Sequence, residues 1–207
     1  PCDFVLMRVL VAWEYRGRVR DAFRRGGHDA MSCDLLPTEV KGPHYLGPVE
    51  DVLHDGWDLM IAHPPCTDLA VSGCAHFAKK YADGRVDRAL DFVRFLMAAP
   101  IERWCIENPV SLISSRICKP DQIIQPWEFG HGECKATCFW LKNLPKLRPT
   151  KHVPGREERI LAMGPSPNRW KERSRTFEGV ADAMGDQWGG RTLPACADQL
   201  DLLSCLA

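Results

Sequence analysis

One stretch decides the fold: WDLMIAHPPC, residues 57–66. Its apolar run from Trp57 to Ala62 predicts a buried strand, and the two prolines that follow predict that the strand stops there. In open parallel sheets, ligands bind where strands end, at the carboxyl edge. A cysteine, Cys66, therefore stands where such a sheet places its functional groups.

Working outward from this stretch, apolar runs alternate with helical patterns. Strands are predicted within Phe4–Trp13, Ala30–Cys33, Trp57–Ala62, Arg103–Ile106 and Thr137–Leu141; helices are predicted after the Gly17 turn, at Asp83–Ala99 and at Gly179–Trp188. In the longest helix, apolar side chains recur at helical spacing, Asp83 is expected to cap the start, and Pro100 ends the pattern. Strands that alternate with helices predict a mostly parallel sheet with helices on both faces.

Composition places the chain among ordinary globular proteins. It has 207 residues, is 45% hydrophobic and 26% charged, and carries no net charge, which excludes a disordered, collagenous or coiled-coil protein. Its longest apolar runs fall far short of the roughly 18 residues that cross a bilayer, and no basic-then-apolar leader opens the sequence. We expect a soluble, cytoplasmic protein with no membrane partner, in which the ten cysteines are reduced thiols.

Charge is distributed unevenly along the chain. From Lys135 to Arg175 there are eleven Lys and Arg residues against three Glu, so a partner that carries phosphate is expected on one face, with a solvated basic loop as the alternative. Residues 143–175 form a Pro-, Lys- and Arg-rich excursion without clear periodicity, and 37–48 are loop-like. We expect a single catalytic domain over 1–188, followed by a tail over 189–207 with a short helix.

Four predicted strand ends carry polar or reactive side chains. They are Glu14 with Gly17, Asp34, Pro64-Pro65-Cys66, and Glu107-Asn108-Pro109. Because these ends meet at one edge of the sheet, a thiol and several carboxylates should share a crevice. A cysteine on the stiff Pro-Pro backbone suits a nucleophile that must be positioned closely, although a buried, non-reactive thiol beside a turn is the alternative.

Pro65-Cys66 and Glu107-Asn108, each directly after an apolar strand, resemble the signature of the cytosine-C5 DNA methyltransferase family. The resemblance spans Val5 to Gly130 and the last helix. It implies a Rossmann-like S-adenosylmethionine-dependent methyltransferase fold, in a short form that lacks a full target-recognition domain. Ser72-Gly73 match the mobile catalytic loop, which closes over the base.

The resemblance assigns the chemistry. The Cys66 thiolate would add to carbon 6 of the pyrimidine, Glu107 would hold ring nitrogen 3 as a carboxylic acid in a dry site, and carbon 5 would then attack the sulfonium methyl. Pro65 and Asn108 would fix the backbone around these two groups, with Pro109 completing the second turn.

The same resemblance also implies which residues bind the cofactor. Gly17 matches a glycine of the first turn, although Tyr15 and Arg16 stand where the family prefers small residues. Asp34 would take the ribose hydroxyls of S-adenosylmethionine, and Asp51 would lie near the adenine. Glu14 would face the methionine amino group, and Pro64 would line the cofactor site.

On the substrate side, Ser72, Lys135 and Thr137 are expected to bind the base or its phosphates. The segment between Thr137 and Gly179 is too short for a recognition domain that reads several base pairs of duplex DNA. The substrates left open are single-stranded DNA, a loosely read duplex, and a free pyrimidine nucleotide of the dCMP or dUMP type.

Other classes of protein remain alternatives. DNA amino-methyltransferases share the Pro-Pro but need polar and aromatic residues where His63 and Cys66 stand. A folate-dependent pyrimidine synthase shares the nucleophile but not the strand and helix pattern. A degenerate homologue would only bind nucleic acid. No metal is expected; the zinc alternative has imperfect spacing. Its candidate ligands are His131, Cys134, Cys138 and His152, and separately Cys74 and His76.

Overall fold

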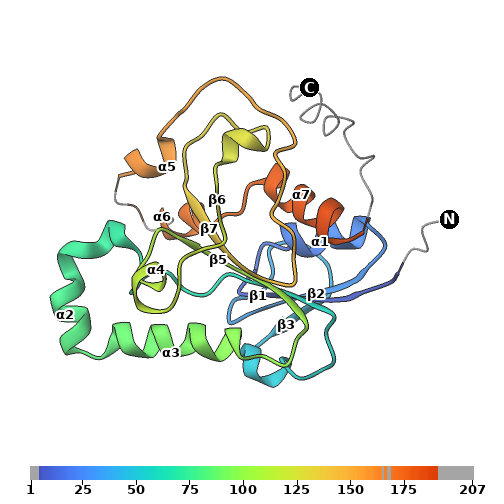
Figure 1. Ribbon diagram of the computed structural model, residues 1–207, viewed down its shortest axis with the longest axis horizontal. Coiled ribbons are helices and arrows are strands. Elements are labelled where there is room, and N and C mark those ends of the chain that lie inside the picture. The colour runs from blue at the N-terminus through green and yellow to red at the C-terminus, as the bar shows by residue number, and fades with distance from the viewer. Residues whose placement is uncertain (1–4, 165, 167–168, 191–207) are drawn as a thin grey trace, which may run out of the picture.

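A computed structural model describes residues 5–164, 166 and 169–190. Its centre is a seven-stranded sheet in the order β3-β2-β1-β4-β5-β7-β6 (Figure 1). The strands are β1 Arg8–Ala12, β2 Asp29–Asp34, β3 His44–Leu46, β4 Leu59–Ala62, β5 Arg103–Pro109, β6 Gln122–Ile124 and β7 Thr137–Lys142. The α-helices are α1 Arg18–Arg25, α2 Phe77–Ala82, α3 Arg85–Met97, α4 Ile113–Arg116, α5 Arg159–Ala162, α6 Arg169–Arg173 and α7 Glu178–Trp188. Three short 3-10 helices are η1 Val49–Asp51, η2 Val71–His76 and η3 Pro126–Glu128.

The first five strands run parallel, and β7 is reversed between β5 and β6. In β4, all four residues are buried, because a central parallel strand is covered on both faces. Adjacent parallel strands bring their carboxyl ends to one edge. This is a Rossmann-like arrangement, and the predicted fold class is confirmed.

Helices cover the two faces of the sheet (Figure 1). On one face, α3 packs over a core that contains Leu10, Met60 and Ile106. On the other face, α1 and α7 lie beside each other over Val9, Ile61 and the neighbouring apolar side chains. Alternate residues of each strand therefore pack into separate cores on the two faces, and both cores fix the position of the strand ends.

Three sequence-based expectations about local structure are corrected. Asp83 does not cap α3: the cap position is Gly84, whose φ of 65° is left-handed, while the Asp83 carboxylate pairs with Arg85 at 3.2 Å. β5 does not end at Ile106 but runs through Asn108 to Pro109, because β7 supplies an antiparallel ladder there.

The third correction concerns segments expected to lack regular structure. The loop over 37–48 contains β3, which pairs with the end of β2. The basic excursion contains α5 and α6, and its earlier part pairs at single bridges with Phe129 and Glu133. Periodicity did not signal these elements because each has only three to five residues.

No helix in the described part of the chain is both long and apolar enough to traverse a lipid bilayer. The predicted tail lies outside the described residues from position 191 onward.

Candidate active site at the strand ends

The loops after β4 and β5 run side by side at the carboxyl edge. The last residue pair between β4 and β5 is Ala62 with Ile106. Glu107 and the 63–66 segment therefore begin side by side, directly after that pair. Asn108, almost fully buried, donates a hydrogen bond from Nδ2 to the Pro64 carbonyl over 2.9 Å. That bond ties the backbone before Cys66 to the strand that carries Glu107.

The Cys66 thiol is partly buried within a tight turn, in which the Cys66 carbonyl accepts the amides of Leu69 and Ala70. Burial raises the pKa of the thiol, and the negative charge of Glu107 raises it further. The positive charges of Lys135 and Arg173 act in the opposite direction. The charge of Glu107 therefore disfavours the thiolate form of Cys66, whereas the charges of Lys135 and Arg173 favour it.

Glu107 is hydrogen-bonded to His63. The distance from His63 Nδ1 to Glu107 Oε2 is 2.9 Å, and the side chains are 11% and 14% exposed. Burial acts to raise the pKa of Glu107, but the hydrogen bond and charge of His63, together with Lys135, hold it below the ordinary value. The prediction that a dry site keeps Glu107 protonated did not include the neighbouring imidazole, which acts against the effect of burial.

Glu14, at the end of β1, turns toward the start of α1. Its two carboxylate oxygens accept the amides of Val19 at 2.6 Å and Arg20 at 3.1 Å. These are first-turn amides, which have no partner within the helix. Burial raises the pKa of Glu14, although His63 and the two amide bonds counteract it. Glu14 therefore anchors α1 in the structure; its contact with a methionine amino group stays a prediction.

Gly17 occupies the cap position of α1 with a φ of 70°. A Cβ there would come within 2.3 Å of Arg20 Nη2, so a side chain would be excluded both by conformation and by space. Arg20 itself is fully buried and contacts Ser32 and the backbone of the 40–43 loop. The turn therefore has no room for a side chain at Gly17, as predicted for a turn that approaches a cofactor. The buried guanidinium of Arg20 packs against it.

Asp34 and Asp51 make their hydrogen bonds with residues other than Cys66. Asp34 ends β2 and accepts the Leu36 amide at 2.9 Å; burial raises its pKa, while His63 is among the groups that lower it. Asp51, in η1, accepts the Tyr45 hydroxyl at 2.6 Å. Asp34 is thus electrostatically linked to the site at β4, whereas Asp51 pairs locally.

The three residues expected on the substrate side are arranged around a strap formed by residues 169–177. Lys135 donates from Nζ to the Arg175 carbonyl over 3.1 Å, and Ser72 is 3.4 Å from Arg173 Nη2. Thr137 starts β7 opposite Pro109, and its hydroxyl donates to the Lys135 carbonyl. The strap therefore connects the loop after Cys66 with the segment that leads into β7.

The strap also reaches the Gly17 turn. Glu172 of α6 lies 3.7 Å from Arg16, and the ring of Trp170 lies 6.2 Å from that of Tyr15. Arg18 donates to the Thr176 carbonyl over 2.7 Å. Tyr15 and Arg16 are thus contacts by which the turn holds the strap.

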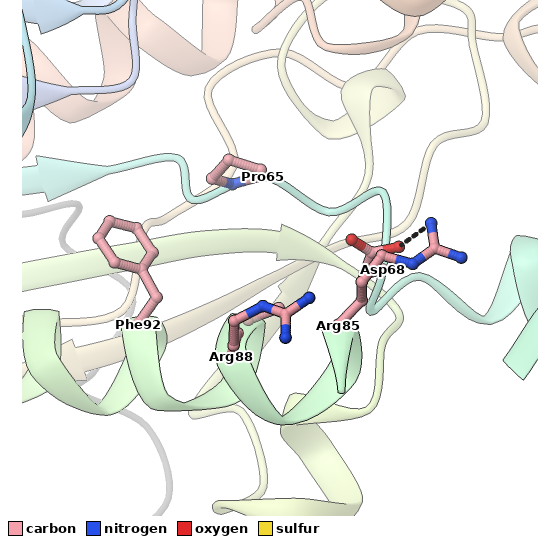
Figure 2. Close-up of a pocket in the computed structure, with 6 residues that line it drawn as sticks. Pro65, Asp68, Arg85, Arg88 and Phe92 are labelled. Carbon is pink, nitrogen blue, oxygen red and sulfur yellow. Dashed lines mark ion pairs between the residues drawn. The ribbon is translucent and has the colours of Figure 1, made fainter. Parts of the chain in front are cut away.

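A cavity of about 240 Å³ opens beside Pro65, between the loop after β4 and α3 (Figure 2). Phe92 and Ala89 form its apolar wall, and Arg85, Arg88 and Asp68 supply the charges. Asp68 Oδ1 is buried without a hydrogen bond among the described residues, although the Arg85 guanidinium lies at 3.5 Å. A ligand with an apolar ring and hydroxyl or amino donors fits this lining.

Trp13 connects the end of β1 with that cavity. Its φ of 59° is left-handed, which is rare for a bulky residue and recurs at functional sites. The indole packs edge-on against Phe92, with ring centroids 4.5 Å apart. The lining thus fits the adenosyl part of the expected cofactor: an aromatic wall joined to the β1 end, with a carboxylate oxygen that is ion-paired with Arg85 and Lys80 but accepts no hydrogen bond from the described residues.

The residues considered for zinc do not converge. Within 5–164, 166 and 169–190, no group of three or more His, Cys, Asp or Glu side chains is arranged to hold a metal ion. His131 Nε2 instead accepts the Gly179 amide at 3.0 Å, and Cys138 is buried in β7.

The strand order, in which β7 alone is reversed, is that of a Rossmann-like methyltransferase fold. One solved structure similar to this chain is the methyltransferase EhMeth of Entamoeba histolytica, at 16% sequence identity and a TM-score of 0.48. The similarity covers 72% of this chain and 58% of the length of EhMeth. No protein-family model and no curated protein matches the sequence.

Three groups in this site were not predicted from the sequence: His63, Arg173, and the Trp13–Phe92 pair. His63 stands three residues before Cys66, so its place at a strand end was the available signal. Nothing local signals the other two, because their partners are distant in the chain.

Proposed function

We propose that this protein transfers a methyl group from S-adenosylmethionine to carbon 5 of cytosine in DNA, through a covalent adduct with Cys66. One observation carries the proposal: the Cys66 loop and the Glu107 strand are joined by the Asn108–Pro64 hydrogen bond at the carboxyl edge of a Rossmann-like sheet. A nucleophile and an acid held at one edge can contact opposite parts of one pyrimidine ring.

Each side chain has a defined task in this proposal. Cys66 forms a bond to carbon 6, and Glu107 supports the charge that develops at nitrogen 3. Lys135 and Arg173 favour the thiolate form of Cys66, because both act to lower its pKa against the effect of burial. Asn108 keeps the two reacting groups in register.

S-adenosylmethionine supplies an electrophilic methyl group when it is bound. Phe92 and Asp68 would hold its adenosyl part in the cavity beside Pro65, with Pro64 in the adjoining backbone. Asp34 would contact the ribose from the end of β2. Gly17, which has no side chain, would let the backbone of the turn come close to the cofactor.

The strap supports DNA rather than a free nucleotide as the substrate. α6 carries Arg169, Lys171 and Arg173, and Trp170 between them is 51% exposed. Cations around an exposed aromatic ring suit a single strand, whose phosphates and base faces they can contact together. Ser72 lies at the edge of this surface, beside Arg173.

The test uses single-stranded oligonucleotides that carry one 5-fluorocytosine within randomised flanks, mixed with protein and S-adenosylmethionine and analysed by intact mass. The fluorine cannot leave as a proton does, so a covalent complex with a methylated base should accumulate. Cys66→Ala should abolish it, whereas Cys118→Ala, which removes an exposed thiol remote from the site, should not.

Parallel reactions use the same label in duplex DNA and in the free nucleotides 5-fluoro-dCMP and 5-fluoro-dUMP. An adduct with a nucleotide alone would replace DNA by the nucleotide alternative. Methyl transfer that survives in Cys66→Ala would refute the covalent mechanism, and the absence of any adduct or transfer in all arms would refute the enzyme.

A further inference from the structure

His63 is a buried side chain in contact with Glu107, and the proposed function gives it no role. It directly follows β4, and its amide donates to the Ala12 carbonyl over 2.9 Å, which continues the ladder toward β1. The ring is therefore fixed between the ends of β1, β4 and β5, with only 11% of the side chain exposed.

The two ring nitrogens have different surroundings. Nδ1 lies 2.9 Å from Glu107 Oε2, whereas Nε2 is buried and has no hydrogen-bond partner among the described residues. A buried polar atom without a partner costs free energy, on the order of 1–3 kcal/mol, so natural proteins rarely keep one without a reason. The unpartnered nitrogen indicates that the ring is retained for its bond to Glu107.

Charged groups reach His63 from several strand ends. Glu107 comes from β5, Glu14 from the end of β1, and Asp34 from the end of β2; the ammonium of Lys135 precedes β7. Burial alone would lower the pKa of His63, but the bond and charge of Glu107, with the charge of Glu14, raise it overall. Both pKa directions favour a proton on His63 rather than on Glu107.

We propose that His63 is a positioning residue that stores the proton which Glu107 delivers to nitrogen 3 of the cytosine ring. This inference rests on the proposed function. It resolves a conflict in the site, because a cytosine nitrogen 3 offers a lone pair and needs a proton donor, whereas the hydrogen bond from His63 favours the carboxylate form of Glu107.

The proton balance is simple. When the Cys66 thiolate bonds to carbon 6, the electron pair of the carbon 5–carbon 6 double bond moves toward carbon 4 and nitrogen 3. Nitrogen 3 gains a proton through Glu107, and Glu107 regains one from His63 Nδ1, so the carboxylate is unchanged and His63 becomes a neutral imidazole. When carbon 5 then attacks the sulfonium methyl, the electron pair moves back from nitrogen 3 into the new carbon–carbon bond, the donor leaves as a thioether, and the nitrogen 3 proton returns through Glu107 to His63. Water then takes the proton of carbon 5, the carbon 5–carbon 6 double bond forms again, and Cys66 leaves as a thiolate.

The first test is independent of catalysis. Histidine ring signals are followed by NMR over a pH series, with His63 assigned from the signal that His63→Asn removes. In the native protein its midpoint should lie above the ordinary value of about 6.5, and in Glu107→Gln it should fall below that value, because burial is then less opposed. Equal midpoints in the two proteins would overturn the proposed proton store.

The second test is the pH dependence of methyl transfer. The native rate should fall as pH rises through the His63 midpoint. In His63→Asn the amide can still donate to Glu107 but holds no titrating proton, so this decline should vanish and the rate should drop about 100-fold or more. His54→Asn, at an exposed turn, is the matched control and should keep the native profile.

A His63→Asn protein with the native rate and the native decline would overturn the inference while leaving the proposed function intact. Failure of the native protein to transfer methyl at all would remove the proposed function and, with it, the catalytic use of the proton. If His63→Asn does not fold, the His63 ring signal is assigned instead by through-bond correlation to its own backbone resonances, and the Glu107→Gln comparison then decides whether the pair holds the proton as proposed.

Discussion

Removing the amide of Asn108 should weaken both the fold and the site. Its side chain is 1% exposed, and its single donated bond, to the Pro64 carbonyl at 2.9 Å, joins the Cys66 loop to β5. Asn108→Ala would leave that buried carbonyl without a donor. Asn108→Asp has nearly the same shape but replaces the donor by an acceptor, so it isolates the hydrogen bond from the packing.

The magnitude follows from these contacts. A buried carbonyl that loses its partner costs about 1–3 kcal/mol. Asn108→Ala also removes Oδ1, which is buried without a partner, and this offsets part of the loss. We therefore expect a decrease of about 2 kcal/mol in the free energy of unfolding, which for a chain of this size lowers Tm by about 4–8 °C.

The assay combines thermal unfolding with methyl transfer to single-stranded DNA. Because the bond also aligns Cys66 with Glu107, the rate under native conditions should fall by about 100-fold, the cost of a displacement near 1 Å. Ser115→Ala removes an exposed bond to Leu112 and should change stability by less than about 0.5 kcal/mol. Native stability and native rate in both Asn108 variants would refute the reasoning.

Further predictions concern stability. Gly179→Ala would place a Cβ within 1.9 Å of the Phe129 carbonyl oxygen and should destabilise the protein by about 3 kcal/mol or more, whereas Gly164→Ala, with open space around it, should not; chemical denaturation compares the two. Glu14→Ala removes both acceptors of the α1 amides and should cost about 2–4 kcal/mol by the same assay, with Glu14→Gln intermediate because it keeps one acceptor. The raised pKa of His63 contributes stability that is fully present below about pH 6.5 and is lost as pH rises through the folded value. Unfolding measured from pH 6 to 9 should show this decline in the native protein, and an unchanged slope in His63→Asn would contradict it.

Much of the fold could be predicted because its information is local. The apolar runs that became β1, β2, β4, β5 and β7 are buried on both faces, and the spacing of Val86, Leu90 and Val93 in α3 matches the buried stripe. Short elements such as β3 and α6 escaped prediction because three to five residues contain too little of any period.

In the candidate site, too, the local features could be predicted from the sequence and the contacts between distant residues could not. Cys66 and Glu107 could be placed at one edge because each directly follows a strand in a parallel sheet. The protonation of Glu107 could not, because it depends on a hydrogen bond to His63 across 44 residues. No local pattern signals the contact between Arg173 and Ser72, because these residues are 101 positions apart.

By itself, the sequence determined which residues form the sheet and which side chains stand at its carboxyl edge, since hydrophobic periodicity and strand termini are properties of neighbouring residues. Only the tertiary structure decided that β5 extends through Asn108, that an imidazole holds Glu107 as a carboxylate, and that the basic strap lies across the Gly17 turn. These depend on strand register and on the packing of remote segments, where a difference of a single residue or a few ångströms changes which groups meet.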